Sequence, residues 1–334
     1  MVTSNPSFPI NLGPQELALA RHLTYDLLGK LYLEGVTAVT LPTLQIIPSL
    51  AQTITRPFNH DESAASHQEL FSFNVFPYES IFLDGSGLLG GPAADAVLRS
   101  YQAAGFIVDA GSTSPDHIGH ELGLLSHLCA AEADAWEDNL TAAADRMRHL
   151  QRNFLQSHLL RWLVPFVVAI KQQERPFYTA LAQLSLDFIY DHWQEITTDA
   201  SLPLMGNSLP EPPDLLGDEK TGLKEIATYL ITPPYSGLFL SRNDITRLTR
   251  SQDIPHGFGD RTQILTNLLR GAAQFEALPN LLSDVQELLR VYQNEYTKAT
   301  REMRGLTRFI AAWQAQIAET DQLLTQIKQQ IESA

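Results

Sequence analysis

The last 50 residues of this 334-residue chain carry a heptad pattern, and no other feature of the sequence constrains the fold as much. Apolar residues recur there at alternating steps of four and three, the spacing of a helical seam. An unbroken helix over residues 285–334 would be roughly 70 Å long at about 1.5 Å per residue, so its apolar stripe needs a partner helix. Thr320 is the one polar member of the seam, which consists of Val285, Leu289, Tyr292, Tyr296, Ala299, Met303, Leu306, Ile310, Trp313, Ile317, Thr320, Leu324, Ile327 and Ile331.

Two arrangements satisfy this pattern. Gly305 can break the segment into a helix pair that packs on the protein's own body. Alternatively, the seam forms an intermolecular coiled coil, which would make the protein a homodimer. The pattern alone leaves both arrangements open.

The rest of the chain also predicts helices, because apolar residues recur at steps of three and four and strand signals are scarce. The inner stripe of the first helix is predicted to be Leu17, Leu23, Leu27, Leu28 and Leu31. The predicted helices cover 14–35, 43–54, 92–101 with an end at Gly105, 142–172 with a kink at Pro165, 177–188, 223–231, a helix capped by Ser241, and 261–275. The predicted fold class is therefore all-α.

A further helix is expected to begin at Ser114, since serine is a good N-cap and Pro115 suits the first helical position. Asp116 would then lie in the first turn, where the helix dipole favours a carboxylate. The inner stripe of this helix would be formed by Ile118, Leu122, Leu125 and Cys129.

The helical pattern stops in a segment rich in proline and glycine. We therefore expect a helical domain over 1–196, a linker over 197–222 and a helical extension over 223–334 with a coiled-coil-like tail.

Compartment and membrane insertion follow from the apolar runs and the cysteine content. The strongest apolar run, 159–170, is too short for a membrane span and contains Arg161 and Pro165. The first residues show neither a charged nor an apolar export segment, and the single cysteine, Cys129, is consistent with a reducing compartment. These features predict a cytoplasmic protein without membrane insertion.

The net charge of −15 is concentrated in the N-terminal part of the chain. Residues 1–150 hold 17 acidic against 6 basic side chains, a charge of −11. Such a field repels nucleic acid and attracts basic ligands, although acidity can also serve solubility alone. No nucleic-acid partner is expected.

Enzymatic patterns are weak. His117, His120, Glu121 and His127 do not match a zinc-protease spacing, and helical geometry directs them to different faces. The glycine-rich segment 84–92 lacks the ending of a phosphate-binding loop. Cys129 lies on an inner stripe and is interpreted as a core residue. We predict no catalytic activity, no metal and no cofactor.

Four segments, taken in order, resemble the TorD/DmsD/NarJ family of redox-enzyme maturation chaperones. They lie at 76–84, 115–128, 153–166 and 177–188, and the resemblance extends over about residues 15–195. The remainder resembles the extension of unusually long members. The resemblance implies a helical chaperone that binds the apo form of a molybdopterin-dependent oxidoreductase and its basic leader peptide, assists cofactor loading and delays export.

The resemblance also implies a leader-binding site. In the family, an Asp-His pair after a proline and an aromatic-Glu-Ser segment are associated with leader recognition, although Ser114 here replaces the usual acidic residue before the proline. A twin-arginine leader needs carboxylates beside an apolar groove. The predicted leader-binding residues are Tyr78, Glu79, Ser80, Phe82, Asp116, His117 and Glu121, with Leu122 as a further groove residue.

Two alternatives accompany this interpretation. Asp116 can merely stabilise a helix start and His117 fill a turn. The protein as a whole can instead be a helical scaffold or adaptor that acts through its C-terminal coiled coil.

Overall fold

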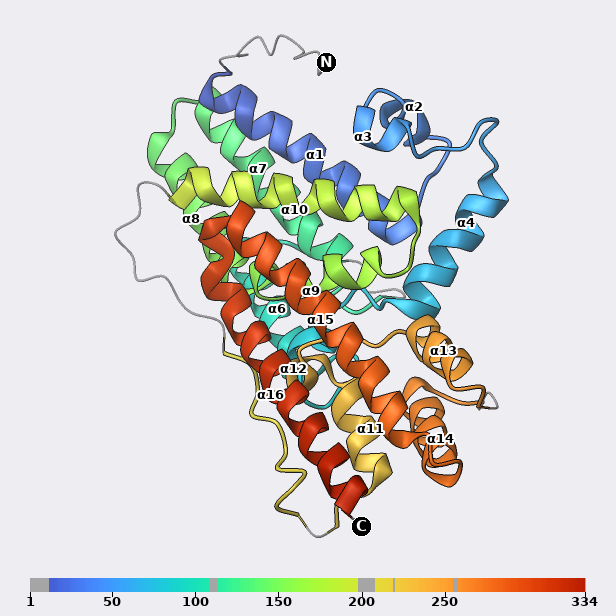
Figure 1. The fold of residues 1–334 in the computed structure, drawn as a ribbon. Coiled ribbons are helices and arrows are strands. Elements are labelled where there is room, and N and C mark those ends of the chain that lie inside the picture. The colour runs from blue at the N-terminus through green and yellow to red at the C-terminus, as the bar shows by residue number, and fades with distance from the viewer. Residues whose placement is uncertain (1–11, 109–112, 198–207, 219, 255–257, 334) are drawn as a thin grey trace.

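The computed structural model describes residues 12–108, 113–197, 208–218, 220–254 and 258–333. Every regular element in these ranges is a helix, so the predicted all-α class is confirmed. Figure 1 shows the helices in an elongated body. They are α1 Pro14–Glu34, α2 Leu41–Leu44, α3 Pro48–Ala51, α4 His60–Gln68, η1 Glu69–Asn74, α5 Glu79–Leu83, α6 Gly91–Ala104, α7 Ile118–Glu137, α8 Thr141–Ser157, α9 Leu159–Lys171, α10 Pro176–Thr197, α11 Leu223–Ile231, α12 Pro233–Ser236, α13 Arg242–Ser251, α14 Arg261–Gln274, α15 Leu278–Glu302, η2 Arg304–Leu306 and α16 Thr307–Ser333.

The helix α1 lies along α7 in the N-terminal part of the molecule (Figure 1). The two backbones approach closely at a glycine pair, because a Cβ atom on Gly119 would lie 2.8 Å from the carbonyl oxygen of Gly29. The predicted inner stripe of α1 was wrong at Leu23, which is 58% exposed. Tyr25 and Arg21 occupy the buried face instead. The hydroxyl of Tyr25 is hydrogen-bonded to Nδ1 of the buried His192 in α10.

Three predicted helix boundaries need correction. The segment 43–54 contains two short turns, α2 and α3, since Pro48 starts a new turn rather than continuing the first. The helix expected from Ser114 begins at Ile118, with His117 as its N-cap. The helix expected over 142–172 is two helices, α8 and α9, which meet at His158.

The helix α9 forms the centre of the core, with eleven of its thirteen residues buried. Its break from α8 is at the backbone of His158, whose φ of −125° and ψ of −93° are not helical, whereas Pro165 lies inside α9. Among the described helices, none is long and apolar enough by itself to cross a membrane. The bent pair α8–α9 meets the length and composition criterion only when both helices are taken together across a bend of 52°.

The C-terminal segment forms the helix pair α15 and α16, which lie side by side in Figure 1 and are separated at Met303–Leu306. Of the two arrangements left open by the sequence, the structure contains the intramolecular one. Thr320, the polar member of the seam, is buried and hydrogen-bonded to the Tyr229 hydroxyl at 2.9 Å and to the carbonyl of Ser236 at 3.1 Å. The seam residues that are buried within this chain are Val285, Leu289, Tyr292, Tyr296, Leu306, Ile310, Trp313, Ile317, Thr320, Leu324 and Ile327.

The extension packs directly on the N-terminal helices. The ring of Phe82 in α5 stacks on Phe239, with 5.3 Å between centroids. Gly237, at a positive φ of 78°, lies so close to α16 that a Cβ atom there would be 2.7 Å from the backbone nitrogen of Ile317. The domain boundaries at 196 and 223 remain predictions, and part of the proposed linker lies outside the described residues.

Candidate functional site

The two motif segments of the N-terminal half meet in space. Tyr78 and His117 form an isolated antiparallel bridge, and their rings contact edge to face with 5.0 Å between centroids. The backbone amide of Glu79 donates to the carbonyl of Asp116 at 3.0 Å. Backbone contacts therefore join the start of α5 to the segment just before α7, although these segments are more than 30 positions apart in sequence.

Asp116 stabilises a helix other than the one predicted. Its buried carboxylate accepts a hydrogen bond from the backbone amide of Ser80 at 2.9 Å, in the first turn of α5, and another from the hydroxyl of Ser114. This carboxylate thus satisfies an orphan amide at the N-terminus of α5. His117 acts on its own helix, since its Nδ1 accepts from the backbone amide of Gly119 at 3.0 Å and caps α7.

The seven predicted leader-binding residues form one cluster, which we call the motif hub. Six of its members are at most 5% exposed, and Tyr78 is half-buried. In this structure Tyr78 alone offers substantial side-chain surface to a ligand. The hub is formed by Tyr78, Glu79, Ser80, Phe82, Asp116, His117 and Glu121.

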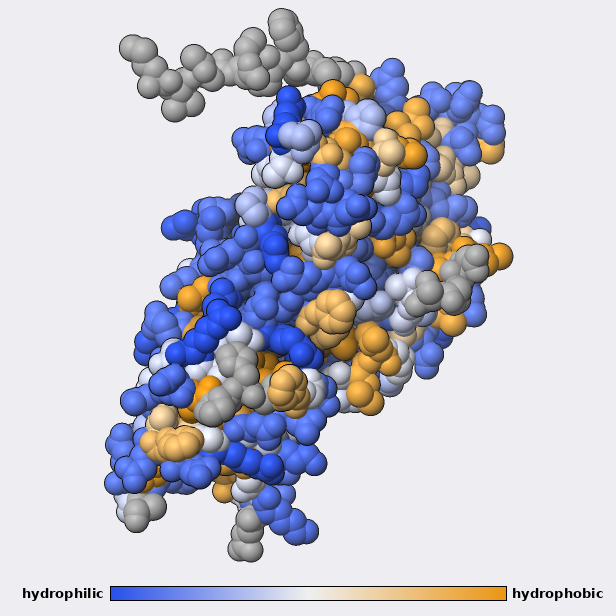
Figure 2. All heavy atoms as spheres, turned by 90° about the vertical axis from the view of Figure 1, so that its right-hand side faces the viewer, coloured by the Kyte–Doolittle hydropathy of each residue, from blue (hydrophilic) through white to orange (hydrophobic). Residues whose placement is uncertain are grey.

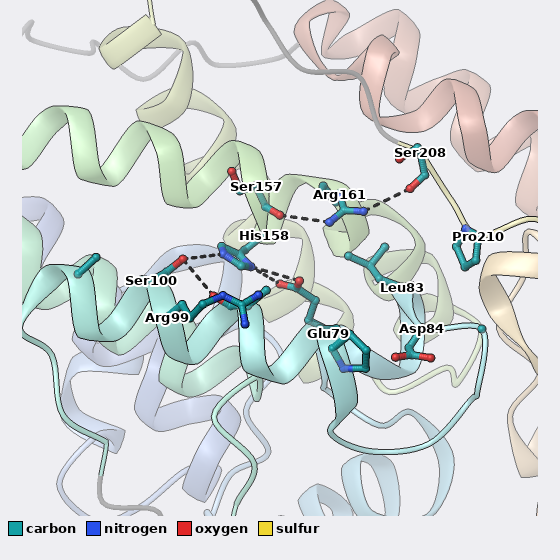
Figure 3. Close-up of a pocket in the computed structure, with 15 residues that line it drawn as sticks. Glu79, Leu83, Asp84, Arg99, Ser100, Ser157, His158, Arg161, Ser208 and Pro210 are labelled. Carbon is teal, nitrogen blue, oxygen red and sulfur yellow. Dashed lines mark hydrogen bonds and ion pairs between the residues drawn. The ribbon is translucent and has the colours of Figure 1, made fainter.

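A chain of three polar side chains leads from the hub to the surface (Figure 3). The buried carboxylate of Glu79 lies 3.0 Å from Nδ1 of His158, and Nε2 of that ring lies 2.9 Å from the hydroxyl of Ser100. The break between α8 and α9 places His158 there. The sequence pattern does not identify His158 and Ser100 as site residues, because both fall inside segments that it predicts to be uninterrupted helix.

Burial controls protonation in the hub. Burial, followed by the nearby carboxylates of Glu79 and Asp116, raises the pKa of Glu121 well above its ordinary value, so the site favours the neutral form of this carboxyl. Burial also lowers the pKa of His117 to about 3, with His120 and His67 as smaller Coulombic causes. The ring of His117 is therefore neutral at pH 7.

A cavity of about 730 Å³ opens beside Glu79 (Figure 3). Its charged side chains are of both signs and comprise Arg99, Arg161, Asp84 and Glu79. Arg161 extends to the backbone carbonyls of Ser157 and Ser208. Within the described ranges, no group of three or more His, Cys, Asp or Glu side chains is arranged to hold a metal ion. The cavity is lined by Glu79, Leu83, Asp84, Gly85, Pro92, Ala93, Ala96, Arg99, Ser100, Ala103, Ser157, His158, Arg161, Ser208 and Pro210.

Comparison with known proteins adds a family to this geometry. Residues 39–168 match the family model of the nitrate reductase delta subunit. No curated protein matches the chain. The matched range contains both motif segments, the Ser100–His158–Glu79 chain and most of α9. Delta subunits of this type are chaperones of redox-enzyme maturation. Over residues 39–168, the chain is therefore similar to the NarJ/TorD-type chaperone family.

Proposed function

We propose that this protein is a cytoplasmic chaperone that binds the twin-arginine leader and the apo form of a molybdopterin-dependent oxidoreductase subunit, assists cofactor loading and delays export. The observation that carries the proposal is the family match over 39–168, which encloses both segments of the motif hub. The charge of −11 on residues 1–150 supports a basic ligand, because it raises the local concentration of cationic peptide.

The chaperone would act by mass action, without bond chemistry of its own. A protein that binds only the incomplete client shifts that client toward the state that accepts cofactor. In this proposal Tyr78 contacts the leader, and the other six hub residues are positioning residues. Asp116 holds the segment before α7 against the start of α5, and His117 caps α7.

Calorimetric titration with a twin-arginine leader peptide tests the proposal. The Arg-Arg peptide is expected to bind about tenfold more tightly than a Lys-Lys peptide of the same length, because guanidinium groups bind carboxylates bidentately. The comparison leaves the protein unchanged, so it cannot be confused with misfolding. Equal affinity for both peptides would contradict twin-arginine recognition, and absence of any binding would contradict leader recognition altogether.

A serine hydrolase is the second candidate function, and the Ser100–His158–Glu79 chain is the observation that favours it. Its distances match a nucleophile, a base and an orienting carboxylate. However, Ser100 lies within the regular helix α6, and its hydroxyl is also 3.3 Å from the carbonyl of Ala96 in the preceding turn. The Ser100–His158–Glu79 hydrogen bonds are thus explained as a structural link from α6, through the break between α8 and α9, to the hub.

A fluorophosphonate probe separates the two functions. We expect no labelling of the folded protein beyond that of its Ser100→Ala variant, because Ser100 acts as a structural hydrogen-bond partner. Mass spectrometry of the intact protein detects the adduct. Stoichiometric labelling that disappears in Ser100→Ala would overturn the non-enzymatic proposal.

A further inference from the structure

A second hollow lies at the arm formed by α2, α3 and α4, between α4 and the start of α10. In Figure 1 this arm stands beside the main body, and Figure 2 shows this side of the molecule, where hydrophobic groups lie among a largely hydrophilic surface. The hollow has a volume of about 450 Å³. We call it the arm groove. Its lining comprises Val36, Thr53, Ile54, Thr55, Phe58, Asn59, Glu62, Ser63, Ala65, Ser66, Glu69, Arg175, Pro176, Phe177 and Tyr178.

Apolar side chains line part of the arm groove, and one buried polar atom of its lining lacks a partner. Ile54, Phe58 and Phe177 are partly buried hydrophobic side chains packed against the core. Tyr178 is 3% exposed, yet its hydroxyl makes no hydrogen bond within the described structure. An unpaired buried hydroxyl costs free energy that a bound backbone or side chain recovers.

The helix α4 forms one wall without burying any of its own side chains. An element of nine residues with no buried face gains little from the rest of this chain, which is typical of a surface that a partner completes. The arm is held at its base, where Nε2 of His67 lies 3.0 Å from the carbonyl of Tyr32 and Arg175 pairs with Glu69 at 2.5 Å.

The charges on the groove favour a cationic partner. Arg175, the single basic side chain of the lining, is neutralised by Glu69. Glu62 has no ion pair among the described residues, and it belongs to the half of the chain that carries −11. An apolar cleft with an unpaired carboxylate at its rim suits a short helix that is apolar along one stripe and basic at one end.

We propose that the arm groove binds the apolar segment of the leader peptide as a helix, with Glu62 pairing an arginine of the basic end. This inference rests on the proposed function and assigns it a place.

Two matched pairs of exposed residues on α4 test the assignment. Ala65 lines the groove and its neighbour Ala64 does not, so Ala65→Trp fills the cleft whereas Ala64→Trp adds the same surface elsewhere. Likewise, Glu62→Arg reverses the charge at the rim, and Asp61→Arg makes the same change of net charge one residue away. All four sites are solvent-exposed, so the variants should fold.

The measurement is fluorescence anisotropy of a labelled twin-arginine leader peptide with each full-length variant. We expect about tenfold weaker binding for Ala65→Trp and a smaller loss for Glu62→Arg that shrinks as salt is added, with both controls near the unmodified protein. If the unmodified protein binds the peptide and Ala65→Trp binds it equally well, the groove assignment is wrong while leader recognition stands. If the unmodified protein does not bind, leader recognition itself fails. Loss of self-association in Ala65→Trp with peptide binding intact would assign the groove to a second copy and overturn the inference.

Discussion

The His117→Asn variant is expected to resist acid better than the unmodified protein. His117 is buried and its pKa is lowered to about 3 by that burial, so the folded state binds no proton there at a pH where the unfolded chain already does. Stability is therefore lost as the pH falls from 6.5 toward 3, by up to about 5 kcal/mol at 1.36 kcal/mol per pH unit. Asparagine keeps the N-cap acceptor for α7 and has no titration.

Urea unfolding at several pH values measures this effect. At pH 7 the variant should be somewhat less stable, since the ring contact with Tyr78 is lost. Between pH 7 and pH 4.5, the free energy of unfolding of the variant should rise by about 3 kcal/mol relative to that of the unmodified protein. Tyr78 and His120 also contact this ring, but they are present in both proteins.

The exposed His60→Asn serves as the control variant. Parallel pH profiles for the unmodified protein and His117→Asn would show that His117 is not the buried neutral ring that we describe. A profile altered to the same degree by His60→Asn would point to general charge effects.

The long helices were predictable from local sequence. Periodicity located α1, α11 and α14 to within one residue at each end, and the Ser241–Asp244 capping box marked the start of α13. The heptad seam located α15 and α16, and Gly305 marked the break between them. These features depend on spacing and capping chemistry within one segment.

Breaks inside apolar runs were not predictable in the same way. The sequence around His158 suits a continuous helix, but the link from Glu79 through His158 to Ser100 requires two distant elements to be in place. The start of α7 was misplaced because Ser114 and Asp116 are good capping residues, but the Asp116 carboxylate accepts from α5 and the Ser114 hydroxyl donates to that carboxylate.

The structure brings the predicted site residues together, but their burial could not be predicted from the sequence. A carboxylate such as Asp116 is ordinarily exposed, and its hydrogen bonds from the backbone amide of Ser80 and the hydroxyl of Ser114 explain its burial. The arm groove carried no motif at all. It is formed by the segment 53–59 and α4 together with the start of α10, which lies more than a hundred residues further along the chain.

Replacing Trp313 by alanine is expected to lower the free energy of unfolding by about 4 kcal/mol, within the range for large-to-small changes at buried aromatic sites. Trp313 is fully buried on α16, and its Nε1 donates to the backbone carbonyl of Arg161 in α9 at 2.9 Å. Trp313→Phe keeps most of the apolar volume and loses the hydrogen bond, so it should cost only about 1–2 kcal/mol.

Urea denaturation followed by circular dichroism gives these values, and sedimentation velocity gives the oligomeric state of the same samples. Since the seam is buried inside the chain, stability should fall without any change of mass. An adaptor working through an intermolecular coiled coil behaves oppositely, because Trp313→Ala would dissociate the assembly and leave the folded chain nearly as stable. A loss of mass in Trp313→Ala at unchanged stability would therefore favour the scaffold function over the chaperone. Arg161 also lines the cavity beside Glu79. The hydrogen bond from Trp313 to its carbonyl therefore means that α16, which lies outside the family-matched residues, helps to hold that site in place.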